Sequence, residues 1–252
     1  IGDIKDALAK GIDDFLAAPT QLVFLAIIYP LVGLFLARLA FGYQVLPLLF
    51  PLIAGYALIG PFAAIGLYEM SRQREQGREI SWTDAFAVLR CPSLDAIGAL
   101  GFVLMVVFVI WLAVALWLYD GLFGSEMPTS ISQFLTEIFT TSRGWTLIIV
   151  GHLLGLVFAV VAFTIGVISF PLLVDRDVGA VVALQTSVRA VLANPVPMAV
   201  WGFIVGAALA IGSLPFFIGL AVVMPVLAHA TWHIYRKVVE RPAGGRPVAS
   251  SA

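Results

Sequence analysis

The chain has 252 residues, of which 61% are hydrophobic and 12% charged, and its net charge is −1. With a mean hydropathy of +1.04, this composition excludes a water-soluble globular domain, in which about 25% of residues are charged, and it excludes intrinsic disorder. The charge balance offers no basic surplus for nucleic acid, and the single Cys excludes an internal disulfide framework. The solvent of this chain is therefore predicted to be a lipid bilayer.

The first half of the sequence contains three long stretches without a charged residue. They predict membrane-spanning helices over about 17–38, 46–68 and 96–119, because each is long enough to cross a hydrocarbon core of about 30 Å. The second stretch contains three prolines, which a span tolerates when neighbouring helices satisfy the freed backbone groups.

The second half predicts three further spans. One covers 145–173, and the uncharged interval from Arg189 to Arg236 is too long for a single crossing. The breakers at Gly212 and Pro215 divide that interval into spans over 196–212 and 215–235. We therefore predict an all-α, polytopic membrane helix bundle of about six transmembrane helices in one domain, 1–240, followed by a disordered tail over 241–252.

An internal repeat suggests that the spans form three hairpins of similar design. The sequence AVLRCP at 87–92 matches AVLANP at 190–195 in four of six positions, each just before a predicted span. Units that point the same way are related by an axis along the membrane normal, unlike inverted transporter repeats.

The distribution of basic residues predicts the orientation in the membrane. Twelve of the 14 Lys and Arg residues fall on the side of the two termini, and only Arg38 and Arg143 fall opposite. Because the basic side of a membrane protein stays in the cytoplasm, we predict a multi-pass protein of the bacterial inner membrane with both termini cytoplasmic.

Several connectors show the periodicity of short amphipathic surface helices. One is predicted over 131–139 on the outer side, and two are predicted on the inner side, after Ser81 and after Gly179. The N-terminal segment repeats the pattern with an apolar stripe formed by Ile1, Ile4, Leu8, Ile12 and Phe15.

The inner connector after the second span is the predicted membrane-surface anchor. Its arginines, Arg72, Arg74 and Arg78, attract anionic headgroups at about 1 kcal/mol each. Two aromatic residues of the following helix, Trp82 and Phe86, are expected to insert beside them. Glu75 and Glu79 dilute the attraction, so the expected role is modest anchoring to membrane lipids.

Two histidines spaced i, i+4, His229 and His233, allow two interpretations. With Glu69 and Asp175 at the same depth, they could chelate a metal or flank a haem. The favoured alternative is that the histidines and Trp232 anchor the helix end at the membrane interface. His152, inside the fourth predicted span, is expected to be a neutral imidazole bonded to a neighbouring helix rather than part of an ion path.

The sequence carries no recognisable catalytic motif, so no catalytic, cofactor-binding or metal-binding residue is assigned and no enzyme activity is expected. Small residues such as Gly202 and Gly206, spaced as GxxxG, favour close helix packing within the bundle or against another membrane protein.

Three segments resemble an uncharacterised family of bacterial predicted integral membrane proteins. They read DALAKGIDDF (6–15), PTQLVFLAIIYPLVGL (19–34) and GPFAAIGLYEMSR (60–72), and the resemblance extends over most of 1–240. It implies an inner membrane protein with about six helices and supplies no catalytic residue. Some members are labelled as related to cytochrome oxidase subunits, but this chain lacks the mid-membrane histidines that haem–copper chemistry requires.

Two functions follow as hypotheses. The first is a non-catalytic membrane protein that associates with or helps assemble a larger membrane complex, with a respiratory oxidase as the candidate partner. The alternative is a transporter or channel for a small or apolar solute, whose path would run among the proline-interrupted spans.

Overall fold

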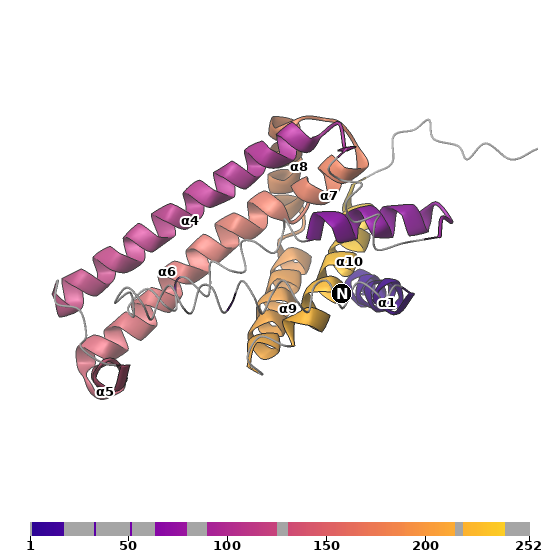
Figure 1. Cartoon of the computed structure of the whole chain (residues 1–252). Helices are drawn as coiled ribbons and strands as arrows, with labels where there is room; N and C mark the ends of the chain where they lie inside the picture. Colours follow the sequence, from indigo (N-terminus) through magenta and orange to yellow (C-terminus); the bar gives the residue numbers. More distant parts are fainter. Residues whose placement is uncertain are drawn as a thin grey trace, which may run out of the picture.

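A computed structural model gives the fold of the chain and describes residues 2–17, 33, 51, 64–79, 90–124, 131–214 and 219–239 (Figure 1). Within these residues every extended regular element is an α-helix and no strand occurs. The predicted all-α, membrane-type helix bundle is therefore confirmed.

Three stretches of helix in the described residues are long and apolar enough to cross a membrane. They are α4 (Leu94–Phe123), α6 (Ser142–Gly166) continued by α7 (Ser169–Asp175), and α9 (Pro195–Ser213). They coincide with the predicted spans 96–119, 145–173 and 196–212. The range predicted for the last span, 215–235, falls on helix α10 (Leu220–Val238), which is not one of the three. The predicted spans 17–38 and 46–68 lie largely outside the described residues, and the tail 241–252 lies wholly outside them.

Helices α4 and α6 form a long hairpin (Figure 1). Its seam is built on Trp111 of α4, which is 5% exposed. A Cβ added at Gly155 of α6 would lie 3.3 Å from the Trp111 ring, and the ring centroids of Trp111 and Phe158 are 5.4 Å apart. Because the outward faces carry large apolar residues such as Phe102 and Trp117, at 70% and 73% exposure, the hairpin has the surface of a helix pair in lipid.

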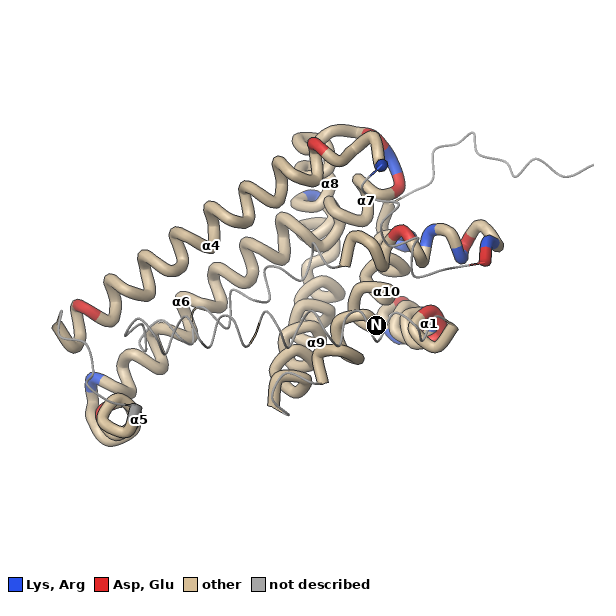
Figure 2. Tube along the Cα trace, viewed as in Figure 1, with Lys and Arg blue, Asp and Glu red and all other residues tan. Residues whose placement is uncertain are grey.

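Charged residues gather at the two ends of these spans (Figure 2). Between Asp95 and Asp120, α4 has no charged residue over a helical rise of about 37 Å. This length matches a hydrocarbon core with its interfaces. The end formed by α1, α7, α8 and α10 carries most of the described charge, whereas Arg143, Glu137 and Asp120 mark the end near α5.

The amphipathic helix predicted over 131–139 is confirmed as α5 (Ile131–Thr140). The hydroxyl of Thr141 accepts a hydrogen bond from the Gly144 N–H at 3.0 Å and caps the start of α6. Glycine is required at 144 because a Cβ there would clash with the carbonyl oxygen of Ile138.

The helix expected after Gly179 is also confirmed, as α8 (Ala180–Ala193). Its Ser187 hydrogen-bonds the backbone groups that are left free where α6 ends and α7 begins. The Ser187 hydroxyl donates to the Thr164 carbonyl at 2.7 Å and accepts from the Ile168 N–H at 3.2 Å, so the interrupted backbone keeps its hydrogen bonds. The inner helix expected after Ser81 lies outside the described residues.

The N-terminal helix α1 (Gly2–Ala17) packs against α10 through a face that shares only part of the predicted stripe: Ile4 is buried and Leu8 packs half-buried against the core. Its buried residues are Ile4, Ala7, Gly11 and Asp14, while Ile12 is 46% exposed. A Cβ added at Gly11 would lie 2.7 Å from the backbone nitrogen of Ala230. Contact at this distance needs small residues, so the closest approach of α1 to α10 is at Gly11.

Candidate functional site

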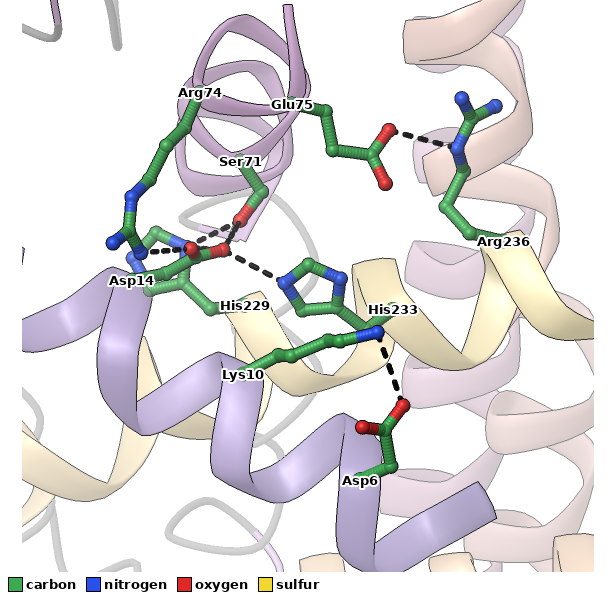
Figure 3. Close-up of polar contacts among 9 residues, drawn as sticks. All are labelled: Asp6, Lys10, Asp14, Ser71, Arg74, Glu75, His229, His233 and Arg236. Carbon is green, nitrogen blue, oxygen red and sulfur yellow. Dashed lines mark hydrogen bonds and ion pairs between the residues drawn. The ribbon is translucent and has the colours of Figure 1, made fainter. Parts of the chain in front are cut away.

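The site is a buried polar cluster where α1, α10 and the helix over residues 64–75 meet (Figure 3). At its centre is Asp14, which is 6% exposed. One carboxylate oxygen, Oδ2, accepts hydrogen bonds from the Ser71 hydroxyl at 2.6 Å and from Nε2 of His233 at 2.9 Å. The other oxygen, Oδ1, is paired with the guanidinium of Arg74. Three segments distant in sequence therefore converge on one carboxylate.

His229 lies behind this carboxylate and is 1% exposed. Its Nδ1 is 2.7 Å from the Ser71 hydroxyl oxygen. Because Ser71 donates its single hydrogen to Asp14, the Nδ1–H of His229 must donate to Ser71. The other ring nitrogen, Nε2, is buried and has no hydrogen-bond partner among the described residues.

The surroundings keep Asp14 ionised. Burial by itself raises the pKa of this carboxyl, but the hydrogen bonds from His233 and Ser71 and the charges of the two histidines outweigh it and lower the pKa to about 2. The cluster thus combines a carboxylate anion with the permanent cation of Arg74.

Ion pairs surround the cluster and attach the end of α10 to its neighbours. Lys237 contacts Asp3 at 2.8 Å and Asp6 at 2.9 Å on α1, and these contacts raise the pKa of the Lys237 amine. Arg236 reaches Glu75 at 2.9 Å on the 64–75 helix (Figure 3). The same three elements that form the cluster are joined again at the surface.

The i, i+4 spacing correctly predicted that the two histidines lie together, but the carboxylates predicted beside them, Glu69 and Asp175, are not their partners. Glu69 accepts hydrogen bonds from Nε and Nη2 of Arg72, each at 2.8 Å, and from the side-chain amide of Gln73 at 2.9 Å. Asp175 accepts from the Tyr235 hydroxyl at 2.6 Å and from Arg236 at 3.1 Å. Neither carboxylate contacts a histidine in these bonds.

The prediction that the histidines and Trp232 anchor α10 at the membrane interface is wrong. Trp232 is fully buried and both histidines are at most 9% exposed, because α1 and the 64–75 helix cover this part of α10. His152, in contrast, is exposed on α6, with its Nδ1 2.7 Å from the Ile148 carbonyl oxygen one turn back in the same helix.

The residues of the predicted membrane-surface anchor differ in their exposure and in their partners. Arg72 and Arg74 are half-buried and paired with Glu69 and Asp14, whereas Arg78 is exposed. Trp82 and Phe86 lie outside the described residues. Lipid anchoring by this set stays a prediction.

The cluster contains Ser, His and Asp, yet its order differs from that of a nucleophilic triad. A triad places the histidine between serine and carboxylate, but here Ser71 donates directly to Asp14. Ser71 is also 1% exposed, so a substrate has no access to its oxygen. Across the described residues, no three His, Cys, Asp or Glu side chains are grouped to hold a metal ion.

The apolar spans with charged ends define an integral membrane protein. The family described as "Predicted integral membrane protein (DUF2189)" matches residues 49–175, half of the chain, and the chain belongs to this family. The segment GPFAAIGLYEMSR falls within the matched range, whereas the two upstream segments that suggested the resemblance precede it. Searches of curated proteins and of solved structures gave no match.

Proposed function

We propose that this protein is a non-catalytic membrane protein that associates with or helps assemble a larger membrane complex, with a respiratory oxidase as the candidate partner. The observation that supports it is the α4–α6 hairpin. Both helices expose large apolar side chains, among them Phe102 at 70%, Trp117 at 73% and Leu153 at 60%. Among the described residues, large apolar side chains on both outward flanks of the hairpin stay exposed, as the spans of a partner protein would require.

The arrangement supports this proposal better than the transport alternative. A solute path needs polar or ionisable groups between spans at membrane depth. The charged groups of α4 and α6 lie near the helix ends, α9 has none, and His152 of α6 is exposed and bonds its own helix. The seam between α4 and α6 is filled by Trp111 and Phe158. The polar cluster at Asp14 is sealed and joins helices, which suits a structural role.

Photo-crosslinking in the native membrane tests the proposal. A photoreactive amino acid at Phe102 or Trp117 is expected to give a discrete protein adduct, and the same group at the buried Trp111 is expected to give none. The complex should also survive on native gels after mild detergent extraction. Lipid adducts alone at both exposed positions, with the chain migrating by itself, would contradict the proposal. Solute uptake by proteoliposomes of the purified chain would favour the alternative.

We also propose that the strongly charged end of the spans faces the cytoplasm of a bacterial inner membrane. The excess of Lys and Arg at that end supports this orientation. In a Cys91→Ser background, an impermeant thiol reagent added from outside should label Gln133→Cys and spare Gln76→Cys. The reverse pattern would overturn the orientation.

A further inference from the structure

A cavity of about 400 Å³ lies where the 64–75 helix ends, α4 begins and α7 ends. This volume falls within the range of roughly 300–1,000 Å³ of sites that hold small molecules. Four arginines line it: Arg72, Arg78, Arg90 and Arg176. The first residues of α4 and the last residues of α7 are each the end of a membrane span. The cavity therefore lies at the level where the chain leaves the hydrocarbon.

The carboxylates of the cavity do not cancel its positive charge. Glu69 is neutralised by the two-point contact with Arg72, and Asp175 is contacted by both Arg176 and Arg236. Arg78 and Arg90 are exposed and have no ion pair among the described residues, and Asp177 is the remaining carboxylate of the lining. Four arginines face three carboxylates in the lining, so the cavity keeps an excess of one positive charge, and the guanidinium groups outside an ion pair are those of Arg78 and Arg90.

The backbone around Arg78 is held in a defined conformation. Gly77 ends the 64–75 helix with φ of 73°, the Arg78 N–H bonds the Gln73 carbonyl at 3.2 Å, and the Gly77 N–H bonds the Arg74 carbonyl at 2.9 Å. This pair of bonds is the Schellman motif, in which glycine supplies the left-handed residue. The position of Arg78 at the cavity is thus set by the helix terminus.

The start of α4 adds to the positive character of the cavity. Ser93, which lines it, makes no cap to its own helix. Its hydroxyl is directed instead to the Arg176 carbonyl and to Asp177, at 3.4 Å each. The uncapped N–H groups of the first turn of α4 and the positive end of its dipole favour an anion here, although Asp95 in that turn offsets part of the effect.

We propose that this cavity binds a phosphate group, held by the guanidinium groups of Arg78 and Arg90, and that the phosphate belongs to an anionic phospholipid headgroup. Arginine binds phosphate through two parallel N–H···O bonds. The depth of the cavity, at the ends of α4 and α7, places it beside the headgroup layer. This is a defined site and goes beyond diffuse attraction of the inner connector to the membrane.

Lipid retention by the purified full-length protein tests the proposal. The protein is exchanged into nanodiscs of phosphatidylcholine with 10–30% phosphatidylglycerol, on the order of native anionic content, and bound lipid is counted by native mass spectrometry. The Arg78→Gln/Arg90→Gln variant should lose about tenfold in phosphatidylglycerol retention. A matched control, Lys5→Gln/Arg189→Gln, removes two exposed cations from the same end and should change retention less than about twofold.

Three further arms complete the test. Arg90→Lys keeps the charge but loses the planar fork, so partial loss supports two-point recognition, and Asp177→Asn should raise retention. Inorganic phosphate that displaces the lipid at millimolar concentration would support the phosphate chemistry with a soluble ligand as its source. Equal losses in the double variant and its control, or no loss in either, would overturn the proposal. Thermal unfolding of each variant verifies that all are folded.

Discussion

Nε2 of His233 on α10 lies 2.9 Å from the carboxylate of Asp14 on α1, although the two residues are 219 positions apart. The hydrogen bond joins the first described helix to the last. Asp14 also binds Ser71 and Arg74 of the 64–75 helix, so one carboxylate connects three elements. The N-terminal helix is consequently part of the folded body and not an independent surface helix.

Removal of this carboxylate is expected to release α1. Asp14→Ala leaves the His229–Ser71 pair and Arg74 without their common acceptor, and breaking a buried ionic contact from one side lowers the free energy of unfolding by about 2–4 kcal/mol. Thermal unfolding in detergent and faster proteolysis within residues 2–17 would measure the effect. The exposed neighbour Asp13 is the control, because Asp13→Ala should change stability by less than about 0.5 kcal/mol. Equal effects of the two substitutions would show that the cluster does not hold α1.

The same carboxylate makes stability depend on acid pH. The pKa of Asp14 is lowered from 3.8 to about 2 in the folded protein, so the ionised form favours folding. This contribution is fully present above the unfolded value, near pH 4, and is lost as pH falls through about 2. It should amount to about 1–2 kcal/mol once solvent screening is allowed for. The stability difference between wild type and Asp14→Asn should therefore narrow between pH 5 and about pH 2, and a constant difference across this range would contradict the assignment.

Close packing of α1 on α10 is expected to make a glycine-to-alanine substitution, which usually stabilises a helix, destabilising at Gly11. Replacing helical glycine by alanine stabilises an exposed site by up to about 1 kcal/mol. At Gly11, however, the new Cβ would lie 2.8 Å from the Cβ of Ala230, so Gly11→Ala should destabilise by about 1–3 kcal/mol. Gly2→Ala on the same helix meets nothing within 4 Å and should be neutral or stabilising. Stabilisation by both substitutions would show that α1 and α10 are farther apart.

Local sequence patterns predicted the elements that depend on local physics. The uncharged stretches located α4, α6 and α9, and the apolar periodicity located α5 and α8. The same periodicity identified α1 as a helix, and of its predicted stripe Ile4 is buried and Leu8 half-buried, whereas Ile12 is exposed and the buried Ala7, Gly11 and Asp14 were not in the stripe. The periodicity missed Gly11 because only a residue without a side chain fits against Ala230, a property of α10 that the α1 sequence does not contain.

The polar cluster could be predicted only in part, for a related reason. The i, i+4 spacing placed His229 and His233 on one face of a helix, because both residues lie in the same element. Asp14 was not assigned to them because its partners Ser71 and His233 are 57 and 219 positions away. The one local signal available was an acidic residue at the buried spacing of Ile4, Ala7 and Gly11, where a carboxylate needs a partner.

The seam of the α4–α6 hairpin offers a comparison between two tryptophans of one helix. Trp111 packs on Gly155 and Phe158, whereas Trp117 is 73% exposed on the outward flank. Lipid solvates an apolar helix about as well as protein does, so Trp111→Ala loses packing contacts but little transfer free energy. Its cost should be about 1–3 kcal/mol, below the 3–5 of a water-soluble core. Trp117→Ala should change stability of the isolated chain by less than about 0.5 kcal/mol, measured by thermal unfolding in the same detergent. A larger effect at Trp117 than at Trp111 would place the outward flank, and not the seam, against protein within the chain, and the proposal that another membrane protein docks there would fail with it.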